Sequence, residues 1–351
     1  MTTFDVRTHV DEALPSPFRT EAPTRPPLRV GAVQCAWSAD SDELCARVSE
    51  GVAIAAEAGA TFVALQELTL SPYFCVDDDV DDAVDRFAED LETGPTAALA
   101  RELAVCHGIH VHASLFERVE ATTSCDDRPR GYNTAICVDA AGEVVSRTRK
   151  THIPEFPYYW EDRYFEPSDA DAGVVDVDGA SFAFPTCWDQ WFPELARCLS
   201  LDGAEVIVYP TAIGNEPHVP DCDSQPMWHQ MITANGLANA TFMIAVNRIG
   251  TEGALTFYGS SFISDPYGRT LVEASRDTPT VLVADLDLDQ RRDWLSFGLL
   301  YTRRPDRYGR LMQTSDLGRP LTRRGDTGAD GAGQPLGSDP RCSGGGSTSG
   351  V

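Results

Sequence analysis

Residues 181–210 read SFAFPTCWDQWFPELARCLSLDGAEVIVYP, and the order of elements within them indicates the fold class. The apolar run SFAFPT predicts a buried strand, and AEVIVYP at the end predicts another. Between them, PELARCLSL predicts a helix with Pro193 in its first turn, where the N–H that proline lacks would have no partner within the helix. A strand, a helix and a further strand in this order are typical of an α/β protein.

The same alternation continues on both sides of this stretch. Helices are predicted at residues 41–59, 95–107 and 227–240, the first from Ala, Val and Ile at helical spacing. Apolar or alternating runs predict strands at 28–36, 61–67, 108–118, 132–140, 143–150, 241–248, 256–266 and 280–288. We therefore expect one mixed-sheet α/β domain over residues 28–311.

The two ends of the chain differ in composition from this middle part. Residues 1–27 are polar and rich in proline, which predicts an N-terminal extension outside the core. From residue 312 onward, Gly, Ser, Asp, Pro and Thr dominate. Such a composition cannot bury a core, so we expect residues 312–351 to form a disordered Gly/Ser-rich tail.

The charge of the chain excludes several classes of partner. Its 351 residues include 54 acidic and 28 basic side chains, a net charge of −26 at pH 7. A field of this sign repels phosphate groups, so we expect no nucleic-acid or membrane partner. No apolar run is long enough to span a membrane and no secretion signal is visible, which predicts a cytoplasmic protein. Because salt screens self-repulsion, we also expect salt adaptation; a Tm that falls between low salt and molar KCl would contradict it.

The basic residues contain a sharper signal. The chain has 27 arginines and a single lysine, Lys150. A guanidinium is planar and forked, whereas an ammonium is a compact charge on a flexible stem. Survival of one lysine where every other basic position is arginine therefore indicates a site that needs an ammonium, although chance survival is the alternative.

The ten cysteines do not indicate a metal site or a disulfide framework. None are spaced as C-x-x-C, and without a secretion signal most are expected to be buried thiols. His110 and His112 of CHGIHVH (106–112) share one face of a predicted strand, but no carboxylate or cysteine partner completes a metal site with them. The acidic run 77–82 does not match a calcium-binding loop. We expect no metal, and one cysteine remains a candidate nucleophile.

Three segments carry the residue types of a thiol mechanism. Glu67 lies at the end of the apolar strand in ALQELTLSPYF (64–74), where a carboxylate is costly unless it is paired. Lys150 lies in a loop rich in proline and aromatic residues (149–169), and Cys187 lies between a strand and a helix, which can present a side chain rigidly. Taken singly, each segment is a weak signal: Glu67 could be a solvent-exposed residue at the end of a strand, and Cys187 could be a core cysteine.

Taken together, these residue types fit catalysis without histidine. A cysteine with an ordinary pKa of about 8.5 is mostly thiol at neutral pH, so it needs a base at the moment of attack. A glutamate held near a lysine can serve as that base. The ammonium can then stabilise the tetrahedral oxyanion, helped by a backbone N–H.

In the order Glu, Lys, Cys, the three segments resemble the carbon–nitrogen hydrolase (nitrilase) superfamily from about Arg29 to Tyr308. The resemblance is strongest to its N-carbamoylputrescine amidase branch. The stretches that carry it are CWDQWFPE (187–194), DGAEVIVYPTAIG (202–214), NRIG (247–250), TFYGSSFISDPYG (256–268), RRPDRY (303–308), KTHIP (150–154) and EDRYFEPSD (161–169).

The resemblance implies an α/β fold, a four-layer α/β/β/α sandwich of the nitrilase type with mixed sheets. It implies a triad with Cys187 as nucleophile, Glu67 as general base and acid, and Lys150 as oxyanion stabiliser. Glu161 is implied to orient substrate and lysine, and the backbone N–H of Trp188 to be the other oxyanion donor. No metal or organic cofactor is implied, and a homo-oligomer, a dimer or larger, is expected.

The implied activity is thiol-dependent hydrolysis of a ureido group, most similar to the conversion of N-carbamoylputrescine, or a related ureido amine, to amine, CO2 and ammonia. Residues 190–192 (QWF) stand where branches that act on N-carbamoyl amino acids carry arginines for the substrate carboxylate. The candidate pocket residues are Tyr73 and Trp191, which can face an alkyl chain or an ammonium, and the acids Glu155, Asp162 and Asp189. β-Ureidopropionase-like activity, aliphatic amidase activity and a non-catalytic binding or scaffold role stay open.

Overall fold

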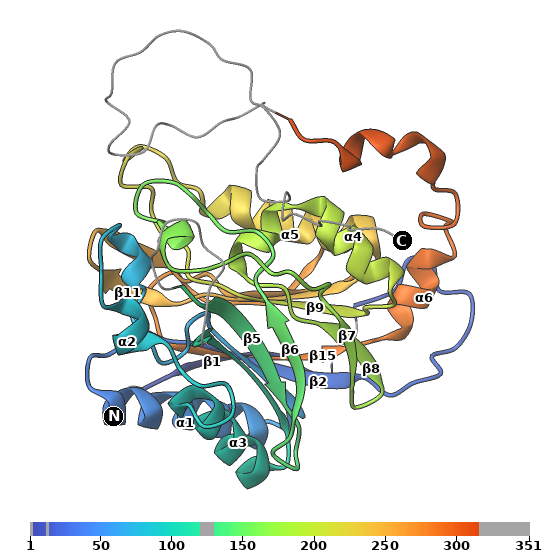
Figure 1. The fold of residues 1–351 in the computed structure, drawn as a ribbon. Coiled ribbons are helices and arrows are strands. Elements are labelled where there is room, and N and C mark those ends of the chain that lie inside the picture. Colours follow the sequence, from blue (N-terminus) through green and yellow to red (C-terminus); the bar gives the residue numbers. More distant parts are fainter. Residues whose placement is uncertain (1–2, 12–13, 120–129, 316–351) are drawn as a thin grey trace, which may run out of the picture. The chain divides into compact units, whose positions relative to one another are not determined.

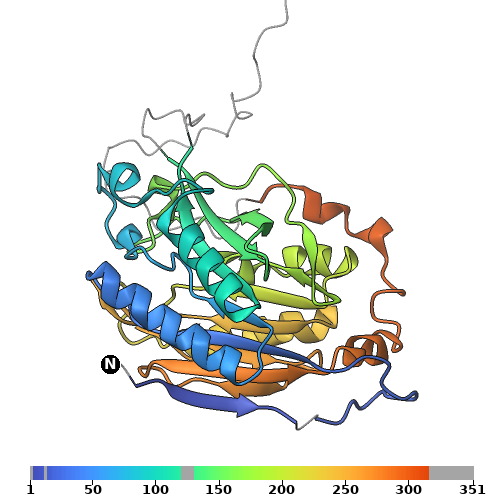
Figure 2. The same ribbon diagram turned by 90° about the horizontal axis from the view of Figure 1, so that it is seen from below.

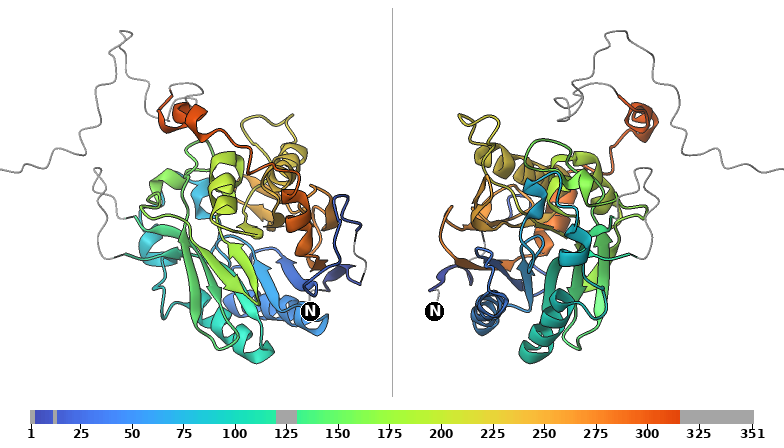
Figure 3. Two further views of the ribbon diagram at one scale, coloured as in Figure 1. Left: turned by 90° about the vertical axis from the view of Figure 1, so that its right-hand side faces the viewer. Right: turned by 60° about the vertical axis from the view of Figure 1, so that its left-hand side comes forward.

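The computed structural model of this chain describes residues 3–11, 14–119 and 130–315. Within these residues the layers are helix, sheet, sheet and helix, as the expected four-layer α/β/β/α sandwich requires (Figures 1 and 3). The predicted disordered tail falls almost wholly on residues 316–351, which lie outside the described residues. Among the described residues, no helix is long and apolar enough to cross a membrane.

The first sheet is mixed and, in the described part of the chain, has seven strands. Its order is β1 (Asp5–His9), β15 (Thr280–Leu286), β2 (Leu28–Gln34), β3 (Phe62–Leu65), β4 (His110–Glu117), β5 (Tyr132–Val138) and β6 (Val144–Arg149). β2, β3 and β4 are parallel, and β5 and β6 add an antiparallel meander through the turn at Ala141-Gly142 that the sequence predicts. Two successive antiparallel pairings make β6 run in the same direction as β3 and β4.

The second sheet packs against the first and has six strands among the described residues. Its order is β14 (Thr270–Glu273), β13 (Phe262–Ser264), β10 (Phe242–Val246), β9 (Val206–Pro210), β8 (Ala180–Ala183) and β7 (Val174–Val177). β8, β9 and β10 are parallel. A separate hairpin consists of β11 (Ile249–Glu252) and β12 (Leu255–Tyr258).

Helices cover the outer faces of both sheets (Figure 1). The first sheet is covered by α1 (Ser41–Glu57) and α3 (Pro95–His107), and the second by α4 (Pro193–Leu201) and α5 (Gln225–Asn239). The remaining helices are short: α2 (Ala83–Phe87), α6 (Asp289–Leu295) and the 3-10 helices η1 (Phe74–Val76), η2 (Glu161–Arg163), η3 (Cys187–Trp191), η4 (Pro305–Arg307) and η5 (Gly309–Met312). Asp40 caps the N-terminus of α1, because its carboxylate accepts the N–H groups of residues 42 and 43.

Three apolar layers hold the sandwich together. The layer between the sheets contains side chains such as Val30, Phe182 and Val208, while separate layers lie beneath α1 and α3 and beneath α4 and α5. Each strand that faces two layers is apolar on both sides, which explains why the runs at 206–210 and 242–246 are continuously hydrophobic rather than alternating.

The predicted strand at 256–266 is wrong in one respect, because the structure divides it into β12 and β13. Gly259 and Ser260 have φ values of 50° and 56° at the division. Two successive residues with positive φ interrupt the extended conformation, and the segment leaves the hairpin there and enters the second sheet.

The expectation that residues 1–27 lie outside the core is also corrected. β1 forms an edge of the first sheet parallel to β15, and Phe4 is buried beneath α1 (Figure 2). Three of the five β1 residues are exposed, so an edge strand with the polar sequence DVRTH leaves no apolar signal.

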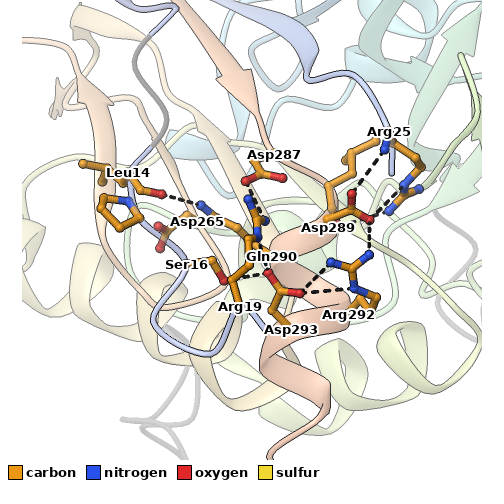
Figure 4. A network of polar contacts seen from close by, with 12 residues as sticks. Leu14, Ser16, Arg19, Arg25, Asp265, Asp287, Asp289, Gln290, Arg292 and Asp293 are labelled. Atoms are coloured by element: carbon orange, nitrogen blue, oxygen red, sulfur yellow. Dashed lines mark hydrogen bonds and ion pairs between the residues drawn. The ribbon is translucent and has the colours of Figure 1, made fainter. Parts of the chain in front are cut away.

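The following segment, residues 14–25, which we call the N-terminal strap, runs along α6 (Figure 4). Arg19 forms ion pairs with Asp287 and Asp293, and the carboxylate of Asp289 accepts hydrogen bonds from the backbone N–H groups of Thr24 and Arg25. The strap is therefore attached to the domain by polar contacts.

Candidate active site

The predicted catalytic residues all follow the carboxyl ends of strands. Lys150 comes directly after β6, Glu67 comes two residues after β3, and Cys187 opens η3 just beyond β8. Since β3 and β6 share one direction in the first sheet and β8 is packed opposite, the loops that follow these strands gather at one edge of the sandwich. This is the edge at which α/β proteins commonly place a site.

Lys150 lies between two carboxylates at the bottom of this site. Its Nζ is 2.9 Å from Glu67 Oε1 and 2.6 Å from Glu161 Oε2, and all three side chains are buried. Burial opposes the charged form of the lysine, but the negative charges of Glu161 and Glu67 outweigh it and raise the pKa of Lys150 well above its ordinary value. The structure therefore holds a buried ammonium at the place of the only lysine.

The two carboxylate oxygens of Glu67 differ in their hydrogen bonding. Oε1 accepts from Lys150 and from Asn133 Nδ2 at 2.8 Å. Oε2 is buried and has no hydrogen-bond partner among the described residues. An oxygen in this state can accept a proton from a neighbouring thiol or water, which is what a general base must do.

Glu161 is held from both sides. Its Oε2 accepts from Lys150, and its Oε1 accepts from the hydroxyl of Tyr73 at 2.8 Å. Burial raises the pKa of the Glu161 carboxyl, and the charge of Lys150 opposes this shift. Tyr73, which the sequence placed in the substrate pocket, instead supports Glu161 from behind.

Cys187 occupies an unusual backbone position. Its φ is 35°, in a region that a non-glycine residue rarely adopts, so the turn stores strain at this residue. Burial raises the pKa of the Cys187 thiol, the charge of Glu67 raises it further, and Lys150 and the backbone N–H of Ala212 lower it. A thiol with a raised pKa does not ionise by itself at neutral pH, so attack requires transfer of its proton to a base.

Asp189 fixes the cysteine turn to the lysine loop. Its buried carboxylate accepts from the backbone N–H of Thr186, and from the backbone N–H of His152 at 2.9 Å. His152 Nδ1 is 2.8 Å from the same carboxylate. Asp189 was a candidate for holding a substrate amine, but these contacts engage it in the support of the turn.

A cavity of about 410 Å³ opens above Cys187. The residues that line it are Pro154, Phe156, Tyr159, Glu161, Cys187, Trp188, Trp191, Ile213, Glu216, Cys222, Ser224 and Met227. Trp191 is where the sequence predicted it, in the wall. Tyr73, Glu155 and Asp162 are not among the lining residues, and the Glu155 side chain is exposed; these three pocket predictions are corrected.

Glu216 is a pocket residue that the sequence analysis missed. It lies in the loop after β9, and its half-buried carboxylate has one oxygen without a hydrogen-bond partner among the described residues. Burial raises the pKa of Glu216, while His218 and Ser224 lower it. A signal was available, because Glu216 follows a strand that runs parallel to the strand before Cys187, and such loops meet at one sheet edge.

The assembled groups are those of a thiol hydrolase. Cys187 and Glu161 line one cavity, Glu161 contacts the buried Lys150, and Lys150 in turn contacts Glu67, whose second oxygen has no hydrogen-bond partner among the described residues. The backbone N–H of Trp188 belongs to the residue after Cys187. Across residues 3–11, 14–119 and 130–315, the His, Cys, Asp and Glu side chains form no group of three or more that could hold a metal ion.

Comparison with known proteins agrees with this geometry. A sequence model of the carbon-nitrogen hydrolase family matches residues 29–295. The N-carbamoylputrescine amidase of Arabidopsis thaliana is 37% identical over 287 residues, covering 78% of this chain and 92% of that protein. The citrullinase of Francisella tularensis is 36% identical over 293 residues, covering 82% of this chain and 98% of that protein.

Solved structures extend the comparison to the fold. A carbon-nitrogen hydrolase from Helicobacter pylori superimposes with a TM-score of 0.74 at 28% identity, covering 82% of this chain and 99% of that one. A variant of the amidase from Nesterenkonia sp. AN1, with acrylamide added at its active-site cysteine, superimposes with a TM-score of 0.62 at 25% identity, covering 78% and 100%. The fold is thus that of the nitrilase superfamily, and the chain belongs to the carbon-nitrogen hydrolase family, as an enzyme that hydrolyses carbon–nitrogen bonds.

Proposed function

We propose that this enzyme hydrolyses the terminal ureido group of a small amine that carries a positive charge at its other end, N-carbamoylputrescine or a related ureido amine. The observation that carries the proposal is the distribution of charge around the cavity. Its described lining contains two carboxylates, Glu161 and Glu216, and no lysine or arginine. A ligand with a cationic end matches this lining, and a ligand with an anionic end does not.

The proposed reaction uses Cys187 as nucleophile. Glu67 accepts the thiol proton through its unpartnered oxygen as the sulfur attacks the ureido carbon, and Lys150 together with the Trp188 N–H stabilises the oxyanion. Collapse expels ammonia or the amine, which takes the proton back from Glu67. Water, activated by Glu67, then releases the acyl group as a carbamate or carbamic acid, whose breakdown gives CO2 and the remaining amine or ammonia.

The shape of the cavity fits a chain of methylene groups. An apolar wall consists of Phe156, Trp188, Trp191 and Met227, and the ring centroids of Trp188 and Trp191 are 6.2 Å apart. Burial of methylene groups against such a wall contributes roughly 0.8 kcal/mol each. Glu216 is the lining carboxylate that is not engaged by Lys150, and we assign it to the ammonium end of the substrate.

The relatives support the same chemistry. N-carbamoylputrescine amidase and citrullinase are named for compounds with a terminal ureido group, and both cover most of this chain at similar identity. Citrulline is the second candidate substrate, since it also has an ammonium group. Its carboxylate has no lysine or arginine to meet among the lining residues, which favours the simple amine; the same argument disfavours N-carbamoyl-β-alanine.

Ammonia release tests the proposal directly. The wild-type enzyme and Cys187→Ala are compared on N-carbamoylputrescine, citrulline, N-carbamoyl-β-alanine and a simple amide such as butyramide. We expect turnover of the putrescine compound with the highest kcat/KM and none by Cys187→Ala. Preference for citrulline or N-carbamoyl-β-alanine would overturn the cationic-end assignment, and preference for butyramide would make the enzyme an aliphatic amidase.

The role of Glu216 has a matched control in the chain. Glu216→Gln removes the carboxylate from the cavity wall, whereas Glu155→Gln removes an exposed one nearby. A hydrogen bond to a charged group contributes about 1.5–3 kcal/mol, so kcat/KM for N-carbamoylputrescine should fall about 10- to 100-fold in Glu216→Gln. Butylurea, which lacks the ammonium, should be unaffected by either change. Equal losses on both compounds would refute the assignment.

A further inference from the structure

Beyond the triad, we infer that Arg248 and Glu252 are positioning residues: they hold the Glu67 loop and, through Tyr73, the Glu161 side chain, which together form the reacting end of the active site. This inference rests on the proposed roles of Glu67, Glu161 and Lys150. Arg248 lies between β10 and β11, in the stretch NRIG whose function the triad does not explain. Glu252 is the last residue of β11.

The guanidinium of Arg248 is fully buried and is committed to the loop that carries Glu67. Its Nη2 donates to three backbone carbonyls, those of Glu67 at 2.7 Å, Leu68 at 2.9 Å and Ser71 at 3.2 Å. Its Nη1 donates to Glu252 Oε1 at 2.7 Å. One side chain thus joins the turn after β3 to the hairpin β11–β12.

That turn needs an external support. Leu68 has a φ of 48°, which a branched side chain adopts only when the surroundings enforce it. The carbonyls of Glu67, Leu68 and Ser71 point toward the buried guanidinium and would otherwise be enclosed away from water. Arg248 therefore holds the backbone from which the proposed general base projects.

Glu252 extends the support to the second carboxylate. Its Oε2 accepts the backbone N–H of Tyr73 at 2.7 Å, while Oε1 is held by Arg248. The hydroxyl of Tyr73 in turn donates to Glu161. Through the backbone at Glu67 and the side chain of Tyr73, the Arg248–Glu252 pair reaches both carboxylates that hold Lys150.

The other strand of the hairpin supports the opposite end of the cavity. The backbone carbonyl of Thr256 on β12 accepts the Asn215 N–H at 3.0 Å, and the Thr256 N–H donates to the side-chain Oδ1 of Asn215 at 2.7 Å. Asn215 directly precedes Glu216, the carboxylate assigned to the substrate cation. One hairpin therefore places the reacting end through Arg248 and Glu252, and the recognition end through Asn215.

This division predicts different kinetic effects for the two strands. Displacement of a reacting group by about 1 Å can lower the rate about 100-fold without weakening substrate binding. We expect Glu252→Gln and Arg248→Lys to lower kcat for N-carbamoylputrescine by about that factor, with KM nearly unchanged. Asn215→Ala should instead raise KM several-fold and leave kcat close to wild type.

The substitutions are chosen to keep the shapes of the side chains. A glutamine at position 252 has one acceptor oxygen for two donors, and a lysine at 248 cannot supply the planar fork that reaches both the carbonyls and Glu252. Arg291→Lys is the matched control, because Arg291 is also buried and donates to the carbonyls of Ser200, Asn239 and Ala240, away from the cavity.

The experiment measures kcat, KM and Tm for wild type and the four variants. The inference is supported if Glu252→Gln has a lower kcat with an unchanged KM, while Arg291→Lys with a similar loss of Tm keeps the kcat of the wild type. Unchanged kcat in Glu252→Gln would overturn it even if Arg248→Lys does not fold. A wild-type enzyme that does not turn over N-carbamoylputrescine would refute the proposed substrate instead, and the same comparison would be made on the amide or ureido compound it does hydrolyse.

Discussion

Two networks of charged side chains, one in the active site and one between the N-terminal strap and α6, differ in their exposure to solvent. In the active site, Lys150 and its two carboxylates are completely enclosed, and one ammonium serves both acids. Between the N-terminal strap and α6, several arginines and aspartates share contacts near the surface, and the Arg19 side chain keeps 22% of its area exposed (Figure 4). Among the described residues, Lys150 is the only cation that pairs with Glu67 and Glu161, whereas the acids at the strap and α6 share several arginines.

The difference explains why arginine was acceptable in one network and lysine was retained in the other. At the strap, a forked guanidinium can bridge two acids at once, as Arg19 does with Asp287 and Asp293. In the proposed mechanism, the Lys150 cation fits between two carboxylates and also faces the reacting oxygen. A compact ammonium meets both requirements, and the larger planar group would displace one of its partners.

Breaking the enclosed network should produce the largest effect. Lys150→Met keeps most of the side-chain volume but leaves Glu67 and Glu161 buried without their cation. Loss of one partner of a buried ion pair costs about 3–5 kcal/mol, which urea unfolding at pH 7 would measure. Turnover should also disappear, because the variant lacks the proposed oxyanion stabiliser. A variant as stable as wild type would show that the acids do not depend on the lysine.

Lys150→Arg sharpens the same point. It preserves the positive charge, so most of the stability should remain, yet kcat should fall at least about 100-fold because the wider cation displaces Glu67 or Glu161. A fully active Lys150→Arg would refute the argument from the single lysine.

Composition and apolar patterns predicted much of this site. Lys150 was identified by being the only lysine, Glu67 by following a buried strand, and Cys187 by its place between strand and helix. The resemblance to a known family then added Glu161. The structure brings Lys150, Glu67 and Glu161 into direct contact, and it places Cys187 and Glu161 in one cavity wall. The catalytic roles themselves stay predictions for the kinetic tests.

The residues that were missed are distinguished by their place in the fold and not by the residues next to them in the sequence. Glu216 is one acid among 54 acidic residues, and only its position after a strand parallel to β8 distinguishes it from Glu155 or Asp162. Arg248 ends an apolar run, and its contacts with the loop 67–71 join segments about 180 positions apart. β1 is polar because it is an edge strand, so pattern alone could not reveal it.

His112 is a second buried basic side chain, but no acidic side chain pairs with it among the described residues. We expect its contribution to the free energy of unfolding to lie between those of Lys150 and the strap network. It is fully buried between the sheets, stacked on Phe184 at 5.1 Å, and neither ring nitrogen has a partner among the described residues. Burial lowers its pKa from 6.5 to about 3. Lys150, enclosed to the same extent but paired with two acids, has its pKa shifted in the opposite direction.

The sign of the pH dependence follows from this shift. Below pH 6.5 the unfolded chain binds a proton at His112 and the folded protein does not, so stability is full above pH 6.5 and is lost as the pH falls toward 3. Between pH 7 and pH 5 the loss should be about 2 kcal/mol. His112→Leu should show a smaller loss over the same range in urea unfolding. Parallel pH profiles for the two proteins would contradict the prediction.

The strap should show the smallest effect and the strongest dependence on salt. Asp289→Asn keeps the shape of the side chain but removes the charge that faces Arg25 and Arg292. The Asp289 carboxylate is buried, but Arg25 and Arg292 are each about one-third exposed and pair with other acids as well. We therefore expect a loss of about 1 kcal/mol with kcat and KM unchanged. In molar KCl the Debye length falls to about 3 Å, and the difference in Tm from wild type should shrink.

Gln290→Met provides the control for salt, since it removes a neutral hydrogen bond to the carbonyl of Leu14 in the same strap. The difference in Tm between Gln290→Met and the wild type should persist in molar KCl, because salt screens charges and not a neutral amide. If both deficits persist equally, the ion pairs at α6 contribute through geometry rather than charge. The active-site and strap networks would then differ in the number of hydrogen bonds that their members share. The loss of unfolding free energy in Lys150→Met should still exceed that in Asp289→Asn, because only Lys150→Met leaves buried charges without a cation.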